Sequence, residues 1–232
     1  MLIDNLNQIR YRMRAAARRA KRDPDALRLV AVTKYASVQA VQELIDSGLV
    51  SEVGENRVQS AEKRKIALGR KAASVQWRMI GHLQTNKAKK AAEIFDAVDS
   101  VDGDRIAAAL DAALAGSERK YPVMVQVKLT DRAAQSGVAP MELEALLDKM
   151  KTYRRLRVSG LMGIAPDVEP PEAARSSFRL LRELRDRHLP DGLLSMGMSR
   201  DFEIAIEEGA DLVRIGTQIF FHPTQASMGA PA

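Results

Sequence analysis

The chain has 232 residues and a net charge of +6, and its composition, 46% hydrophobic and 28% charged, is enough for one sizeable core. It contains no cysteine and three histidines, which excludes disulfides and thiolate metal sites and argues against structural zinc. No apolar run is long enough to span a bilayer and no secretory leader opens the chain, so we expect a cytoplasmic protein outside the membrane.

Residues 1–24 are assigned to an N-terminal helical segment, with the helix over residues 2–22 and Pro24 ending it. Its apolar stripe comprises Ile3, Leu6, Ile9, Met13, Ala16, Ala17 and Ala20. Arginines occupy the rest of the helix, and we interpret them as a solvated basic face. Nucleic-acid binding is the less favoured alternative, because only Tyr11 accompanies the arginines as a stacking residue.

Residues 28–34, RLVAVTK, form a short apolar run rich in β-branched residues and are predicted as a buried parallel strand ending at Lys34. Further strands are predicted at residues 52–53, 75–80, 95–98, 122–130, 157–162, 193–196 and 211–215, separated by helical patterns. Eight strands alternating with helices predict a single-domain (β/α)8 TIM barrel over residues 1–232, with residues 223–232 as a loose tail. An open doubly wound sheet is the alternative, but its glycine-rich fingerprint is absent after the first strand.

Lys34 is predicted at the C-terminal mouth of the first strand, the face where α/β barrels place their chemistry. Apolar surroundings disfavour the charged form of a lysine, so partial burial there would make it a candidate Schiff-base nucleophile. The alternative is a lysine that reaches into solvent or pairs with a carboxylate.

The loops after strands seven and eight are the usual phosphate sites of such barrels. Gly197, Met198 and Ser199 are predicted to open the helix after the seventh strand, and Gly216 and Thr217 follow the eighth. Helix capping and a tight turn would explain either loop alone. The occurrence of both together favours a phosphate site.

Arg214 lies on the last predicted strand, where a buried guanidinium must find an acceptor. An acidic side chain would satisfy it, and so would a pyridine nitrogen that stays unprotonated. With Lys34 for an aldehyde and the two loops for a phosphate, Arg214 completes the pattern of a pyridoxal 5'-phosphate (PLP) site. No one of these parts suffices alone.

Stretches along nearly the whole chain are similar to those of a known family: LVAVTK, VGENRVQ, WRMIGHLQTNK, SVD, GLMGIAP, LSMGMSRDFEIAI and LVRIGTQIF. In these stretches the chain resembles the pyridoxal phosphate homeostasis proteins, also called YggS-like. The resemblance implies an alanine-racemase-like barrel of fold type III, with PLP held as an internal aldimine on Lys34. It also implies phosphate contacts from Ser199, Gly216 and Thr217 and a place for Arg214 near the pyridine nitrogen. Three further residues fall in family motifs around the pocket: Asn56, Asn86 and Met198.

The resemblance implies a protein that keeps intracellular PLP, the active form of vitamin B6, in balance without robust catalysis. PLP-dependent apo-enzymes are the expected recipients, and a monomer is the expected state. Fold type III racemases add a second domain and take a tyrosine base from a partner subunit, whereas only a short tail follows the eighth strand here. A weak PLP-dependent amino-acid racemase is the alternative function, and a nucleic-acid-associated barrel is a less favoured one.

The chain departs from the family at three positions: Lys128 stands where the family commonly has asparagine, Gln135 where it has lysine and Phe221 where it has glycine. Alternation along the fifth strand directs Met124, Gln126 and Lys128 into the barrel, so Lys128 is expected near Lys34 or a bound acid. Because Gln135 stands in place of the family's loop lysine, a secondary PLP site that uses this lysine is not expected here.

Overall fold

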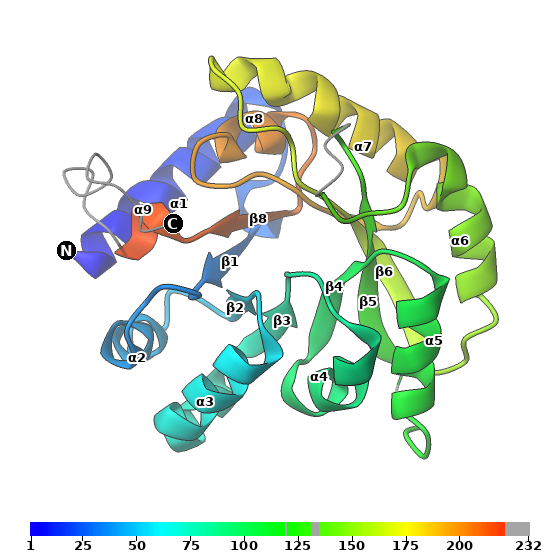
Figure 1. Ribbon diagram of the computed structural model, residues 1–232. Coiled ribbons are helices and arrows are strands. Elements are labelled where there is room, and N and C mark those ends of the chain that lie inside the picture. The colour runs from blue at the N-terminus through cyan, green and yellow to red at the C-terminus, as the bar shows by residue number, and fades with distance from the viewer. Residues whose placement is uncertain (119, 131–134, 221–232) are drawn as a thin grey trace.

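A computed structural model describes residues 1–118, 120–130 and 135–220 of the chain, and Figure 1 shows its ring of strands inside a layer of helices. The strands in this part of the chain are β1 (Arg28–Val32), β2 (Glu52–Glu55), β3 (Gln76–Met79), β4 (Ala97–Val101), β5 (Tyr121–Val127), β6 (Leu156–Gly163), β7 (Leu193–Ser195) and β8 (Leu212–Ile215). Each strand pairs in parallel with the next, and β1 pairs with β8 to close the barrel. The predicted (β/α)8 barrel is therefore confirmed.

Helices cover the outside of this barrel in the order that the sequence predicts. They are α1 (Leu2–Arg19), α2 (Val38–Asp46), α3 (Val58–Leu68), α4 (Ala88–Ile94), α5 (Asp104–Ala113), α6 (Leu143–Met150), α7 (Arg175–His188), α8 (Phe202–Glu207) and α9 (Thr217–Phe220). Short 3-10 turns occupy Pro24–Ala26, Gly69–Ser74, Thr85–Lys87, Pro140–Glu142 and Pro171–Ala174. None of the described helices is both long enough and apolar enough to cross a membrane.

The apolar core has two layers, as a barrel requires. Val123, Val125 and Val127 belong to the larger layer between strands and helices. Met124 lies inside the barrel, where it packs with Val30, Met162 and Leu212. The alternation predicted for the fifth strand is thus confirmed over β5.

A charged network lies buried in the barrel and joins β1, β2, β3 and β4. Arg78 on β3 donates two hydrogen bonds to Asp99, at 2.7 and 2.6 Å, and a third to Glu52 at 3.0 Å. Glu52 also accepts from Arg28, and these two residues begin β2 and β1, away from the strand ends that carry the candidate site. The opposite charges and bidentate geometry compensate the cost of burying these groups.

Several sequence-derived boundaries need correction. The fourth strand does not end at residue 98, because β4 continues to Val101 with Asp99 and Ser100 buried within it. Polar residues remain in this strand since Arg78 and the carbonyl of Gly81 pair with them. The first helix ends at Arg19 instead of residue 22. Phe221 and the expected tail at residues 223–232 lie outside the described residues.

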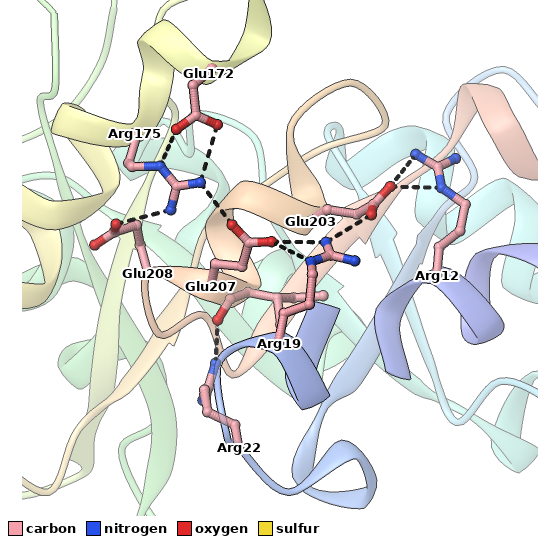
Figure 2. Close-up of polar contacts among 9 residues, drawn as sticks. Arg12, Arg19, Arg22, Glu172, Arg175, Glu203, Glu207 and Glu208 are labelled. Atoms are coloured by element: carbon pink, nitrogen blue, oxygen red, sulfur yellow. Dashed lines mark hydrogen bonds and ion pairs between the residues drawn. The ribbon is translucent and has the colours of Figure 1, made fainter. Parts of the chain in front are cut away.

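Arginines of α1 lie on an exposed face, as the sequence predicts, and two of them also form ion pairs with α8: the side chains of Arg12 and Arg19 stay 43% and 51% exposed. Figure 2 shows Arg12 and Arg19 on α1 facing Glu203 and Glu207 on α8. Arg22, just after α1, donates to the carbonyls of Ile206 and Ala210. These ion pairs offset part of the positive charge of α1, which was the reason to consider nucleic-acid binding as an alternative.

The same network continues from α8 to α7. Glu207 and Glu208 accept hydrogen bonds from Arg175, which is also paired with Glu172. Helices α1, α8 and α7 are therefore joined by one run of alternating charges across the outside of the barrel. A network of this kind holds the short helix α8 on both sides.

Candidate functional site

A cavity of about 360 Å³ opens at the C-terminal mouth of the barrel. It is lined by Val32, Lys34, Tyr35, Ala36, Asn56, Ile80, Ile164, Asp167, Met198, Ser199, Arg200, Asp201, Arg214, Gly216, Thr217 and Phe220. The predicted site residues Lys34, Asn56, Met198, Ser199, Arg214, Gly216 and Thr217 are all brought together here. Asn86 is not among them, because it lies in the 3-10 turn after β3 and lines a separate depression with His82 and Asp102.

Lys34 follows the end of β1 by two residues and lies in a turn. Its side chain is exposed, and its Nζ lies 4.8 Å from the centroid of the Tyr35 ring. Such a cation–π contact is compatible with a solvated ammonium group. The partial burial expected for this amine is therefore wrong, although its place at the barrel mouth agrees with the sequence prediction.

The backbone around Lys34 is held by Arg64, a residue of α3. Arg64 donates to the carbonyls of Thr33 and Ala36, at 3.0 and 2.9 Å, so its two bonds bracket Lys34. A third bond at 2.9 Å reaches Glu55, which is fully buried and also accepts from the Thr33 hydroxyl at 2.6 Å. The carboxylate thus fixes the guanidinium that fixes the Lys34 loop (residues 33–36).

Sequence reasoning missed this arrangement, although the sequence contained a signal for the ion pair. Glu55 immediately follows the glycine of a buried strand, where an unpaired carboxylate would be costly. A charged residue in that position requires a partner of opposite charge. Arg64 lies nine positions later, on the next helix, and supplies that partner.

Arg214 is a buried cation whose described hydrogen bonds go to neutral groups. It is 4% exposed, and its two terminal nitrogens donate to the Ser195 hydroxyl at 2.8 Å and the Gly163 carbonyl at 2.9 Å. Burial lowers the pKa of Arg214 to about 10, and the negative charges of Asp99 and Asp201 oppose that shift. The group is therefore still charged at neutral pH. Arg214 lines the cavity, so its guanidinium lies beside any ligand that enters it.

The 196–201 loop after β7 is shaped by Gly197 and Asp201. Gly197 has a φ of +90°, and a Cβ there would lie 2.5 Å from the Cβ of Ala205, so only glycine fits. Asp201 accepts from the backbone N–H of Met198 at 2.6 Å, and burial raises the pKa of Asp201. The helix begins at Phe202 and not at Ser199, which corrects the expectation that Ser199 would lie at a helix start. Ser199 belongs to the loop between β7 and α8.

The turn after β8 packs directly against β1. A Cβ at Gly216 would approach the Val32 carbonyl oxygen to 2.9 Å, so glycine lets this turn lie at the cavity wall. Thr217 follows and begins α9 with its side chain exposed. Gln218, the next residue, donates to the Ser199 carbonyl at 2.7 Å and joins this turn to the 196–201 loop.

Apolar walls and a rim of charges complete the cavity. Ile80 and Ile164 follow β3 and β6 directly and supply flat apolar surface, a role that sequence reasoning did not assign. Asp167 and Arg200 form an ion pair of 3.1 Å on the rim. Gln135 donates to the Ile164 carbonyl at 2.7 Å and so supports one wall from behind.

Lys128 lies one residue beyond the end of β5, partly exposed, and is absent from the described lining of the cavity. The expected place beside Lys34 is therefore not supported. The backbone N–H of Lys128 instead donates to the Val138 carbonyl at 2.9 Å, which holds the chain after β5.

The donor set of this cavity fits one particular chemistry. An exposed primary amine can condense with an aldehyde, and hydroxyl and backbone N–H groups at Ser199, Gly216 and Thr217 can donate to an anion. Arg214 offers a donor to a ring nitrogen between apolar walls. The close approach that Gly216 permits adds backbone donors that a larger residue would cover.

Comparison with known proteins gives consistent results. The family described as "Alanine racemase, N-terminal domain" matches residues 5–223. A protein of Pseudomonas aeruginosa named "Pyridoxal phosphate homeostasis protein" is 39% identical over 232 residues, covering 100% of this chain and 98% of its own.

Solved structures resemble the chain as well. PipY of Synechococcus elongatus PCC7942, determined with PLP bound, superimposes with a TM-score of 0.75 at 32% identity, covering 90% of this chain and 99% of its own. An alanine racemase of Clostridium difficile 630 has a TM-score of 0.70 at 13% identity, and the match covers 95% of this chain and 55% of that one. The second likeness shows the fold alone.

Proposed function

Because this chain belongs to the family of pyridoxal phosphate homeostasis proteins, we propose that it binds PLP and serves in PLP homeostasis. The observation that carries the proposal is the convergence of Lys34, Ser199, Arg214, Gly216 and Thr217 on one cavity. The PLP-bound structure of PipY, at 32% identity, supports it. The function is binding and delivery of the cofactor, with no robust turnover of an amino acid.

Lys34 supplies the covalent anchor. Its primary amine would condense with the aldehyde of bound PLP, with loss of one water. Exposure of Lys34 keeps both water and protons within reach of this reaction. PLP supplies an aldehyde and an electron-withdrawing ring, and the protein supplies the amine and the groups that orient it.

The remaining residues bind and orient the ligand. Ser199, Gly216 and Thr217 hold the phosphate, and Arg214 donates to the pyridine nitrogen. An arginine has no lone pair to accept with, so a ring nitrogen facing Arg214 stays unprotonated and withdraws electrons weakly. This pairing favours storage of the cofactor over carbanion chemistry. Met198 and Asn56 line the same cavity, whereas Asn86 is left out of this assignment because it lines another depression.

The cellular setting follows from the same proposal. We assign PLP-dependent apo-enzymes as recipients, the cytoplasm as location and a monomer with one PLP-binding domain as the working unit. The exposure of Lys34 is consistent with transfer, because the amine of a recipient could reach the bound cofactor from solvent.

An absorption spectrum with borohydride reduction tests the proposal. The protein incubated with PLP is expected to become yellow, and reduction is expected to fix the cofactor to Lys34, as located by peptide mass mapping. Lys34→Ala should lose the visible band, while Lys87→Ala, a change in a neighbouring depression, should keep it. A wild-type protein that stays colourless, or a reduced lysine other than Lys34, would contradict the assignment.

A further inference from the structure

The N-terminal helix α1 contacts both short helices that follow the candidate phosphate loops. Arg12 on α1 donates to Glu203 of α8 at 2.8 Å, and its guanidinium carbon lies 4.7 Å from the centroid of the Phe202 ring. Figure 2 shows Arg12 reaching Glu203 from the outside of the barrel. Arg12 is therefore fixed against the helix that ends the 196–201 loop.

The same guanidinium also reaches the second loop. Arg12 donates through a terminal nitrogen to the side-chain oxygen of Gln218, at 3.1 Å, next to Thr217 in the chain. The amide nitrogen of Gln218 in turn donates to the Ser199 carbonyl at 2.7 Å. An amide has a donor end and an acceptor end, so a cation on the oxygen side turns the nitrogen toward Ser199.

We propose that Arg12, acting through Gln218, is a positioning residue that sets the separation of the two loops that hold the phosphate of PLP. The inference rests on the proposed function and deepens it. Arg12 is not among the residues that line the cavity. Without its guanidinium, the acceptor oxygen of Gln218 loses this donor, and the amide is free to turn away from Ser199.

Within the part of the chain that the structure describes, the neighbouring arginines Arg14 and Arg19 do not contact both α8 and Gln218. Arg19 pairs with Glu203 and Glu207, both on α8, and so reaches only one of the two loops. Arg14 pairs with Asp25, far from either loop in the chain, and its side chain is 50% exposed against 43% for Arg12. Arg14→Ala is therefore a control matched in helix, charge and exposure.

Affinities for PLP and for pyridoxal, which lacks the phosphate, separate this role from a general loss of folding. In Arg12→Ala, the Kd for PLP is expected to rise about tenfold, equal to about 1.4 kcal/mol, while the Kd for pyridoxal changes less than about twofold. Arg14→Ala should leave both constants as in the wild type. Arg19→Ala should leave the ratio of the two constants unchanged, because it does not bridge the loops.

Gln218→Leu provides a second, independent test that leaves the Arg12–Glu203 ion pair in place. Gln218→Leu should raise the Kd for PLP without a similar rise for pyridoxal, as expected for Arg12→Ala. It also provides the test if Arg12→Ala fails to fold. Equal changes for PLP and pyridoxal in Gln218→Leu, or no change in either, would overturn the inference while leaving the proposed function intact. A wild-type protein that binds neither ligand would overturn the proposed function itself.

Discussion

Replacing Arg64 with methionine should both destabilise the fold and loosen the amine that captures PLP. Glu55 is fully buried and the Arg64 side chain is 10% exposed, so the variant leaves a buried carboxylate without its cation. Removing one partner of a buried ion pair typically costs about 3–5 kcal/mol. One oxygen of Glu55 has no hydrogen-bond partner, and the other would keep only the Thr33 hydroxyl, so we expect a loss of that size in the unfolding free energy.

A double variant separates stability from loop position. Glu55→Leu combined with Arg64→Met removes both charges, and such replacements are often close to neutral, so most of the unfolding free energy should return. The bonds to the Thr33 and Ala36 carbonyls remain absent, so the Lys34 loop stays loose. The affinity of the double variant for PLP should therefore remain below that of the wild type.

Urea unfolding followed by circular dichroism measures the first effect, and PLP titration by absorbance measures the second. Lys90→Met, which breaks an exposed ion pair of α4 with α3, is the matched control and should cost at most about 1 kcal/mol. The reasoning is refuted if Arg64→Met loses no more than Lys90→Met. It is also refuted if the double variant binds PLP as tightly as the wild type.

Three other predictions test the barrel around the site. Gly197→Ala should lower stability by more than about 1 kcal/mol and weaken PLP binding, because its Cβ would clash with Ala205 and φ is +90°. Gly103→Ala, where an added Cβ meets no atom beyond the chain neighbours within 4 Å, should cost less and leave PLP binding unchanged. Arg78→Met should cost about 3–5 kcal/mol in urea unfolding, since it leaves Asp99 buried without its cation while Glu52 keeps Arg28, and a loss below about 1 kcal/mol would contradict this. Burial raises the pKa of Asp201, so the charged form opposes folding and stability falls as the pH rises through that pKa. The stability of Asp201→Asn relative to the wild type should therefore increase as the pH rises above about 4, the ordinary pKa of an aspartate, in thermal melts, and a difference independent of pH would contradict it.

The sequence predicted the barrel well because its strands carry a local signal. β1 and β5 are short runs rich in β-branched residues, and in β5 the alternation alone separated Met124 inside from Val125 outside. The end of β4 was missed because Asp99 looks like a loop residue until Arg78, on another strand, is known to pair with it. Pairings between distant residues leave no mark in local periodicity.

The candidate site was predicted in its composition more than in its geometry. Lys34, Arg214 and the two loops could be found because barrels place chemistry at strand ends. The exposure of Lys34 and the start of α8 at Phe202 depend on how loops pack, which strand patterns do not determine. The role of Arg64 was missed for the same reason, since its targets are backbone carbonyls that have no sequence signature.

The pairing of the two ends of this chain has a consequence for its biosynthesis. Asn5 donates to the carbonyl of Ile219 at 3.1 Å, and β1 hydrogen-bonds with β8, so α1 and β1 are completed by elements made about 180 residues or more later in the chain. A nascent chain on the ribosome exposes the apolar side of α1 until the residues of α8, β8 and α9 have been translated. A protein stalled before β8 thus has neither a closed ring nor a cofactor pocket, and its first helix is left as a surface for chaperones to recognise.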